Sequence, residues 1–500
     1  MRILFSRVIA GVMILAALYV LLFGSKPGSY EYPDATAVPK DFTVVTYWEK
    51  WTREEGAGMQ RVVDLFNTTE GRDKKIFVQL VSVSQVDQKT LVATAGGDPP
   101  DIAGLWGQQL GAFITYGALR PLTELQADGT ITAETYKPFL WKCVAPHGTV
   151  YAASSTPATV AIFWNKDLFR EAGLDPERGP QSIKELDEMA DRLTVVDGKG
   201  QIIRAGYLPN FPGWWDYSWG EFFGNKIWNE ETDDFRIDTP ENVRAYSWYQ
   251  KYAIKYGPGT VQTFGAGFGQ VATPQNPFMN GTVAMCLQGP WFVSYVENYT
   301  PRFAKLNFSY IQRQLSRREI TQAQADAKII EARELFAEHY GAAMPPNSIG
   351  KPGDALHGDL DIWAIPRGAK HVKEALEVIR FFTRQENMEL LCTWHSKPSP
   401  LMKVSEKFIR NHPNPYIDVF EEMLRSPNIT GLPQSPNWIR AQDQIRLAAN
   451  ALWRSPERNA VEPTLRQAQE NFDRHLAEYR KYAGMRKQVE SASSGSEGRR

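Results

Sequence analysis

The chain has 500 residues and a formal net charge of -1, with 56 Lys and Arg against 57 Asp and Glu. This length exceeds one ordinary domain, and the near-neutral balance gives no general attraction to nucleic acid. Charged residues make up 23% and hydrophobic residues 43%, which excludes a disordered or fibrous chain. The mean hydropathy of -0.39 and the lack of a second long apolar run exclude a polytopic membrane protein.

Residues 1–40 predict an export segment followed by a tether. Arg2 and Arg7 precede an uncharged apolar run at 8–23, which is the design of a secretory signal, and Gly24 extends the run. Neither an A-x-A cleavage site nor a lipoprotein Cys follows. Two interpretations therefore remain, a cleaved signal peptide or an uncleaved anchor formed by residues 8–24. Both place the rest of the chain outside the cytoplasm.

The body of the chain predicts alternating strands and helices. Residues 42–48 (FTVVTYW) and 76–83 (IFVQLVSV) are rich in β-branched and aromatic residues, and the apolar residues between them recur at helical spacing. Strand, helix and strand within about 40 residues form a βαβ unit, which predicts a parallel sheet in an α/β fold. Further helices are predicted from Ser182 onward and over 372–391.

The segment at 311–340 differs from its surroundings because it contains no Gly or Pro and many Arg, Glu, Ala and Gln. Thr321 and Gln324 have the spacing of a capping box, which predicts a helix start. We expect a helical hairpin inserted between two strands, and favour a solvated decoration over a docking surface for it. The polar tail at 483–500 is expected to be disordered.

Five sequence blocks follow one another between residues 96 and 291. They are GGDPPDI at 96–102, GALRPL at 117–122, VYA at 150–152 with TP at 156–157, FWNKDLFREAGL at 163–174, and FMNGTVAM at 278–285 with GPW at 289–291. In this order the blocks resemble the extracellular solute-binding proteins of ABC importers (family 1), in the large group that includes maltose-binding protein. The resemblance covers roughly residues 42–482.

The resemblance implies a two-lobed periplasmic-binding-protein fold (type II) with the ligand cleft between the lobes. The first lobe would hold residues 42–155 and 341–394, and the second lobe 156–310 and 395–482. The hairpin at 311–340 would be an insertion near the second crossover. At the last crossing, this chain has Ser396 and Lys397 where the family commonly has a Gly.

Tryptophan residues indicate the candidate ligand site, because many of the 15 Trp adjoin Gly, Pro or Asn in predicted loops, where recognition residues are common. An indole stacks on the apolar face of a sugar, while polar side chains bond to its hydroxyls. Trp48, Glu49 and Lys50 end the first predicted strand, where open α/β sheets bind ligands. The remaining ligand-binding candidates, from one loop and from the resemblance, are Trp106, Trp214, Trp215, Asp216, Trp291 and Trp438. Four other tryptophans are expected in the core, namely Trp228, Trp248, Trp363 and Trp453.

The resemblance implies the substrate-binding component of an ABC importer, at the periplasmic or extracellular face of the bacterial cytoplasmic membrane. It would capture a small solute, foremost a sugar or oligosaccharide, by lobe closure and deliver it to separate permease subunits. Such a protein is not an enzyme and needs no cofactor, metal or nucleic acid, and the sequence contains no P-loop, HExxH or GxSxG motif.

Two alternatives stay open. A secreted carbohydrate-active hydrolase would pair carboxylates such as Glu49 and Asp216 across a glycosidic bond. An anchored sensor or scaffold would use the hairpin to dock a partner. The sequence does not name the solute, and it leaves the pairing of Cys143, Cys286 and Cys392 open.

Overall fold

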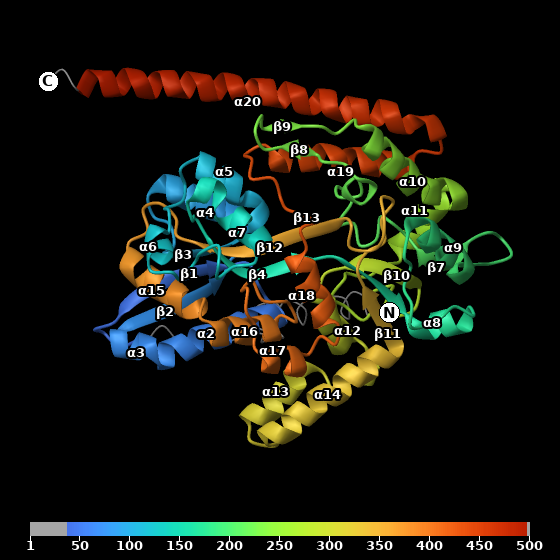
Figure 1. Ribbon diagram of the computed structural model, residues 1–500, viewed down its shortest axis with the longest axis horizontal. Helices are drawn as coiled ribbons and strands as arrows, with labels where there is room; N and C mark the ends of the chain where they lie inside the picture. The colour runs from blue at the N-terminus through green and yellow to red at the C-terminus, as the bar shows by residue number, and fades with distance from the viewer. Residues whose placement is uncertain (1–37, 498–500) are drawn as a thin grey trace, which may run out of the picture.

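The computed structural model describes residues 38–497, with side chains to residue 481, so the predicted export segment at 8–24 lies outside the described residues. Two mixed β-sheets with helices around them form two lobes, and each lobe has its own hydrophobic core (Figure 1). The predicted two-lobed α/β fold is therefore confirmed. No helix within residues 38–497 has the length and apolar character that a membrane span needs.

The first lobe is built on a sheet with the order β13-β12-β3-β1-β2, in which β4 also pairs with β12. Its strands are β1 (Thr43–Glu49), β2 (Ile76–Ser82), β3 (Ile102–Trp106), β4 (Ala153–Thr159), β12 (Leu356–Ala364) and β13 (Ile429–Thr430). β1 is parallel to both β2 and β3, whereas β12 is antiparallel to β3 and β4. The predicted βαβ unit is thus confirmed, with β1 and β2 in register from one end to the other.

Helices cover the first sheet, and two of them, α2 and α15, pack on it with the apolar face that their periodicity predicts. The helices around this sheet are α2 (Arg53–Thr68), α3 (Glu70–Lys74), α4 (Val86–Gly96), α5 (Leu110–Thr115), α6 (Thr123–Ala127), α7 (Pro138–Val144), α15 (Val372–Phe382) and α16 (Gln385–Trp394). Two further helices, α17 (Glu406–Asn411) and α18 (Ile417–Arg425), follow the segment after α16. α18 contributes to both cores, since Ile417 lies in the first and Phe420 in the second.

The second lobe contains a sheet with the order β11-β5-β10-β7-β6 and a ribbon of β8 and β9. The strands are β5 (Ala161–Asn165), β6 (Val195–Val196), β7 (Ile202–Tyr207), β8 (Trp228–Asn229), β9 (Asp234–Phe235), β10 (Val283–Gln288) and β11 (Tyr340–Ala343). The helices are α8 (Lys166–Glu171), α9 (Ile183–Leu193), α10 (Pro240–Tyr256), α11 (Pro258–Ala266), α12 (Phe292–Tyr299), α19 (Trp438–Arg454) and α20 (Val461–Glu497). α20 runs beside α19 along one side of the molecule (Figure 1).

The strand pairings correct three of the predicted lobe boundaries. All of β4 pairs with β12, so the first crossing comes at Val160 rather than after residue 155. β11 pairs with β5, which places residues 341–343 in the second sheet. β13 pairs with β12 and lies in the first sheet, although 395–482 was expected in the second lobe. Pairing between distant segments sets these boundaries, and local periodicity carries no information about it.

The inserted segment forms the expected helical hairpin, α13 (Phe308–Ser316) and α14 (Gln322–His339), and Thr321 and Gln324 make the predicted capping box. The hairpin is not only a solvated decoration, however. Its apolar face packs on α16 of the first lobe, where the rings of Phe308 and Trp394 lie 5.0 Å apart. In the segment where a disordered tail was expected, α20 continues to Glu497, and residues 498–500 lie outside the described residues.

Candidate functional site

The carboxyl ends of β1 and β3 meet at one edge of the first sheet. β1 ends in Glu49, followed by Lys50, and the neighbouring parallel strand β3 ends in Trp106. Just beyond β3, the Gln108 side chain accepts a hydrogen bond of 3.4 Å from Gln442 on α19. This edge therefore faces the second lobe, as expected for the ligand edge of an α/β sheet.

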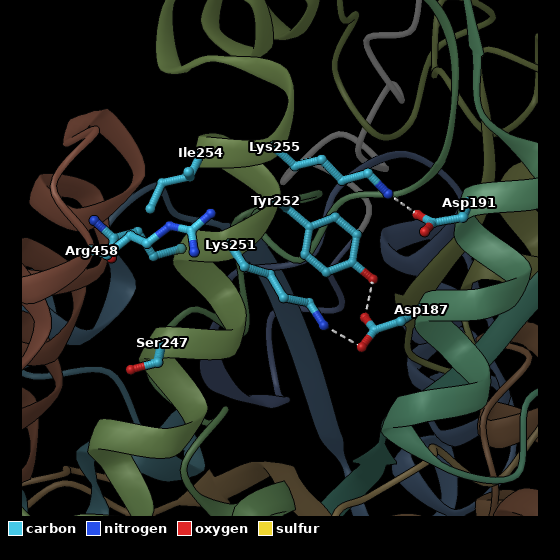
Figure 2. Close-up of a pocket in the computed structure, with 9 residues that line it drawn as sticks. Asp187, Asp191, Ser247, Lys251, Tyr252, Ile254, Lys255 and Arg458 are labelled. Carbon is cyan, nitrogen blue, oxygen red and sulfur yellow. Dashed lines mark hydrogen bonds and ion pairs between the residues drawn. The ribbon is translucent and has the colours of Figure 1, made fainter.

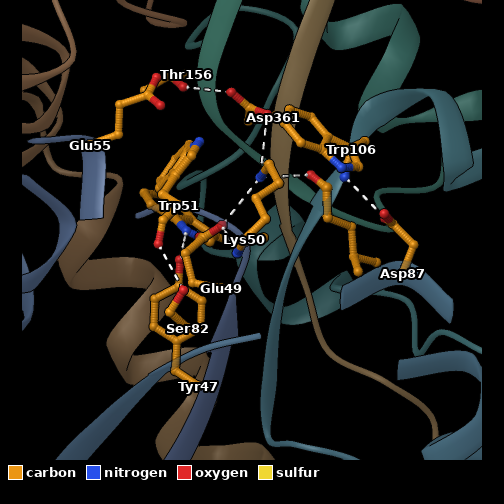
Figure 3. A network of polar contacts seen from close by, with 12 residues as sticks. Tyr47, Glu49, Lys50, Trp51, Glu55, Ser82, Asp87, Trp106, Thr156 and Asp361 are labelled. Carbon is orange, nitrogen blue, oxygen red and sulfur yellow. Dashed lines mark hydrogen bonds and ion pairs between the residues drawn. The ribbon is translucent and has the colours of Figure 1, made fainter. Parts of the chain in front are cut away.

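Lys50 is the centre of a buried polar network at this edge (Figure 3). Its ammonium lies 3.2 Å from a Glu49 carboxylate oxygen and 3.3 Å from Asp361, with only 5% of the Lys50 side chain exposed. It also donates to the Leu105 carbonyl at 3.2 Å. The other Glu49 oxygen accepts a hydrogen bond from the Tyr47 hydroxyl. Both Glu49 oxygens are thus occupied within the protein.

Asp361 on β12 holds a second cation, Lys397, from the segment after α16. The Lys397 ammonium lies 2.8 Å from the Asp361 carboxylate, and the Thr156 hydroxyl donates to the same carboxylate at 3.0 Å. Burial would raise the pKa of Asp361, but Lys397 and Lys50 outweigh it and lower this pKa to about 2. Asp361 therefore stays ionised and fixes both ammonium groups.

Two more carboxyl groups border the network. The Asp87 carboxylate accepts a hydrogen bond of 3.2 Å from the backbone N–H of Trp106. Burial raises the pKa of Asp87 to about 6, although the charge of Lys50 opposes the shift. Glu55 lies 3.9 Å from Lys397, and burial raises its pKa as well. Counting Glu49 and Asp361, four carboxyl groups surround two ammonium groups, so the site offers an anion no excess positive charge.

Indole rings lie beside the two cations. The Lys50 ammonium is 4.4 Å from the centroid of Trp51 and 4.8 Å from that of Trp106. The Lys397 ammonium is 5.6 Å from Trp51 and 5.2 Å from Trp291, which belongs to the second lobe. Trp106 keeps 42% of its surface exposed, so its face remains open to a ligand.

The second lobe continues this series of rings. The Trp291 centroid is 6.3 Å from both Trp214 and Trp215. Trp214 is 38% exposed, whereas Trp215 is buried and packs edge-on against His357 at 5.5 Å. We place Trp214 among the accessible rings, and Trp215 behind them as support.

Asp216 follows in the same loop and is almost fully buried. Its carboxylate Oδ1 has no hydrogen-bond partner among the described residues. Burial raises the pKa of Asp216 to about 7, against the partly opposing charge of Arg446. The structure thus places Asp216 beside the tryptophan pair, with a carboxyl group that is protonated in part near neutral pH.

Two of the predicted ligand residues lie elsewhere. Trp438 is 1% exposed and stacks on Phe235 at 6.3 Å inside the second core, so the predicted ligand contact of Trp438 is corrected to a packing role. The cause is that α19 turns its first residue inward. Trp48 is partly buried and packs on the first core. Of the expected core tryptophans, Trp248, Trp363 and Trp453 are buried and Trp228 is partly buried.

Sequence reasoning missed several members of the network: Trp51, Glu55, Asp87, Thr156, Asp361 and Lys397. Trp51 adjoins Lys50 and was within reach of the strand-end argument. Lys397 follows Ser396, which has a φ of 54° in the left-handed region that favours glycine. The departure from the family's Gly therefore marked the right place, although it did not reveal the ion pair.

A separate cavity of about 590 Å³ lies between α9 and α10 (Figure 2). Asp187 pairs with Lys251 and accepts the Tyr252 hydroxyl at 2.7 Å, and Asp191 pairs with Lys255. These charges neutralise one another, and none of the predicted ligand residues lines this cavity. It is not the candidate site.

Metal-ligand clusters and disulfides were searched for among the described residues. Within residues 38–481, no three His, Cys, Asp or Glu side chains come together in a way that would hold a metal ion. The three cysteines all lie among the described residues, buried and unpaired.

The chain matches the family model described as bacterial extracellular solute-binding protein over residues 50–389. It is 22% identical to the sn-glycerol-3-phosphate-binding periplasmic protein UgpB of Pectobacterium atrosepticum, over 71% of this chain and 72% of that protein. It is 21% identical to the maltooligosaccharide ABC transporter solute-binding lipoprotein of Streptococcus pneumoniae, over 77% of this chain and 78% of that protein. Among solved structures it resembles CpMnBP1 with mannotriose bound, with a TM-score of 0.68 and 23% identity, over 86% of this chain and 100% of that one.

Proposed function

The chain belongs to the family of bacterial extracellular solute-binding proteins, and we propose that its solute is a neutral sugar or oligosaccharide held between the two lobes. We infer that the protein acts at the outer face of the cytoplasmic membrane and delivers the sugar to the permease of an ABC importer. Two relatives support a polyhydroxylated ligand, since one binds maltooligosaccharide and the other glycerol phosphate.

The main support for a neutral ligand is the balance of positive and negative charges beside the indole rings. Lys50 and Lys397 are both held by Asp361, and further carboxyl groups surround them. A phosphate would meet these carboxylates without a free cation to offset them. A sugar needs only the exposed indole rings of Trp106 and Trp214, the partly buried ring of Trp291, and polar atoms for its hydroxyls. The arrangement therefore favours a sugar over a sugar phosphate.

Lobe closure would be the binding step. Trp106 lies on the first lobe and Trp291 on the second, so a ligand that stacks on both rings contacts the two lobes together only when they are close. Such a ligand binds the closed state more tightly and shifts the population toward it. The permease would then recognise the closed form.

We propose that this step involves no covalent chemistry. The hydrolase alternative requires one carboxyl group to act as an acid and a second to act on the sugar carbon or on water. Both Glu49 oxygens are engaged by Tyr47 and Lys50, which leaves Glu49 without a free proton-transfer position. We expect manno- and malto-oligosaccharides to be recovered intact after incubation with the protein, and shorter products on a chromatogram would support the hydrolase instead.

A thermal-shift screen against sugars, sugar phosphates, polyamines and amino acids tests the proposal. A ligand that binds only the folded state raises the melting temperature with its concentration. We expect a rise with one sugar class that is lost in Trp291→Ala and kept in Trp228→Ala, a partly buried tryptophan on β8 of the same lobe. A rise with sugar phosphates but not with sugars would overturn the neutral ligand. No rise with any solute would overturn the carrier.

A further inference from the structure

The first turn of α2 lies against α12 of the second lobe. α2 begins directly after the site, since the Trp51 ring lies beside both cations of the network and Arg53 is the first residue of the helix. Burial raises the pKa of Tyr295 on α12, and the charges of Glu55 and Glu54 raise it further, which places the start of α2 close to this ring. The two lobes therefore meet beside the site, between α2 and α12.

Arg53 makes direct hydrogen bonds to the second lobe. Its guanidinium donates to the Ala272 carbonyl at 3.3 Å and to the Tyr299 hydroxyl at 3.4 Å. Ala272 lies in the loop between α11 and β10, and Tyr299 is the last residue of α12. Because the donor belongs to one lobe and both acceptors to the other, these bonds persist only while the lobes are close together.

The two bonds lie outside the candidate ligand site. Arg53 is exposed, and its acceptors are not members of the network around Lys50 and Lys397. A guanidinium that moves away from these acceptors is hydrated by water instead, so the net gain from the bonds is modest. We take it as about fivefold in the ratio of closed to open molecules.

From this geometry we propose that Arg53 is a latch, a residue that holds the two lobes in the closed position without touching the solute. A latch stabilises the closed state relative to the open state. It therefore raises the apparent affinity for every solute by the same factor when the free protein is mainly open. The inference rests on lobe closure in the proposed function, but it does not depend on which solute binds.

The backbone of Arg53 makes it possible to separate the side chain from local strain. Its φ of 51° lies in the left-handed region that favours glycine. Arg53→Ala removes the guanidinium and keeps the strained backbone, whereas Arg53→Gly removes both. Since the latch depends on the guanidinium alone, we expect the two variants to lose closure equally.

Two further variants complete the set. Tyr299→Phe removes one acceptor from the second lobe and keeps the ring. Arg72→Ala is the matched control, because Arg72 is an exposed arginine on α3 of the first lobe whose nearest carboxylate, that of Asp73, is exposed as well. Melting temperatures of all the variants report their folding.

Two measurements on the full chain read the latch. Spin labels at Val92 on α4 and Ile203 on β7, both exposed, give the distance distribution between the lobes without ligand. Calorimetric titration with mannotriose and with maltotriose gives the affinities. We expect Arg53→Ala to move the distribution toward the open state and to weaken both sugars by one common factor of about fivefold.

The other variants have their own expected results. Tyr299→Phe should act in the same direction with a smaller effect, and it should add nothing once Arg53 is alanine. Arg72→Ala should match wild type in both measurements.

Unchanged distances together with unchanged affinities in Arg53→Ala would refute the latch. Losses that differ between the two sugars would also refute it, because they would mean that Arg53 contacts the solute. An effect in Arg53→Gly that Arg53→Ala does not share would assign the change to the backbone instead. Failure of the wild-type chain to bind either sugar would count against the proposed solute only. The ligand-free distances would then decide on the latch, and unchanged distances would refute it.

Discussion

The Lys397 ammonium lies 2.8 Å from the Asp361 carboxylate, with 4% and 5% of the two side chains exposed. Lys50 and Thr156 bond to the same carboxylate, so Asp361 joins four segments that are distant in sequence. This arrangement neutralises the two cations of the site before any ligand arrives. It is the physical reason why we expect a neutral ligand rather than a phosphate.

Asp361→Ala should strongly destabilise the protein. The substitution leaves Lys397 and Lys50 buried without their shared counter-ion, and breaking such a buried pair costs about 3–5 kcal/mol of the free energy of unfolding. Urea denaturation measures the loss. The matched control is Asp41→Ala, which removes an exposed partner of Lys75 and should cause no measurable change. A loss in Asp361→Ala as small as in the control would show that the network does not hold the fold.

Asp216→Asn should change how stability depends on pH. Burial raises the pKa of Asp216 from 3.8 to about 7, so between these values the folded state holds a proton that the unfolded state releases. The contribution of Asp216 to the free energy of unfolding is therefore greatest below about pH 4. It falls by on the order of 2–4 kcal/mol as the pH rises to 7. The asparagine cannot ionise, so its stability advantage over wild type should grow across this range and level off above pH 7. Denaturation curves for both proteins at four pH values decide the matter, and parallel pH profiles would contradict the prediction.

Trp438→Ala should mainly reduce stability, whereas Trp106→Ala should mainly reduce sugar affinity. Trp438 is 1% exposed, and truncating such a core tryptophan costs about 3–5 kcal/mol of the free energy of unfolding. Trp106 is 42% exposed, so its loss should cost less than about 1 kcal/mol but weaken sugar affinity about tenfold. Denaturation and calorimetry on both variants measure the two quantities. Unchanged sugar affinity in Trp106→Ala would remove this ring from the site.

Phe308→Ala should loosen the two lobes. The hairpin continues into β11 of the second sheet, yet Phe308 packs on Trp394 of the first lobe, so the contact restrains relative motion. Arg333 adds to it by donating to the carbonyls of Ile409 and His412 at 3.0 and 3.1 Å. We expect a broader distance distribution between the lobes in the ligand-free variant.

Spin labels at Val92 on α4 and Ile203 on β7 report this distance, because both positions are exposed and the native cysteines are buried. Ile330→Ala is the control, since it removes an exposed apolar side chain from α14 of the same hairpin. An identical distribution in wild type, Ile330→Ala and Phe308→Ala would show that the hairpin does not restrain the lobes.

The family and the two-lobed α/β fold could both be predicted from the amino-acid sequence alone. The motif blocks, the β-branched strands around the first helix and the capping box at Thr321 are local patterns, and local patterns are legible in one chain. The strand-end argument also placed Glu49 and Lys50 at the ligand edge of the sheet, where Trp106 at the end of the neighbouring parallel strand lies as well.

Which of the candidate residues are accessible to a ligand could not be predicted, because it depends on how distant segments pack. Asp361 and Lys397 are 36 positions apart, and their pairing follows from two chain segments meeting beside β4. Trp214 lies in a loop that contains Pro and Gly, and Trp438 directly follows a Pro-rich loop, yet Trp438 is buried and Trp214 is exposed. Ion pairing and burial depend on contacts between remote segments, and neither spacing nor composition specifies those contacts.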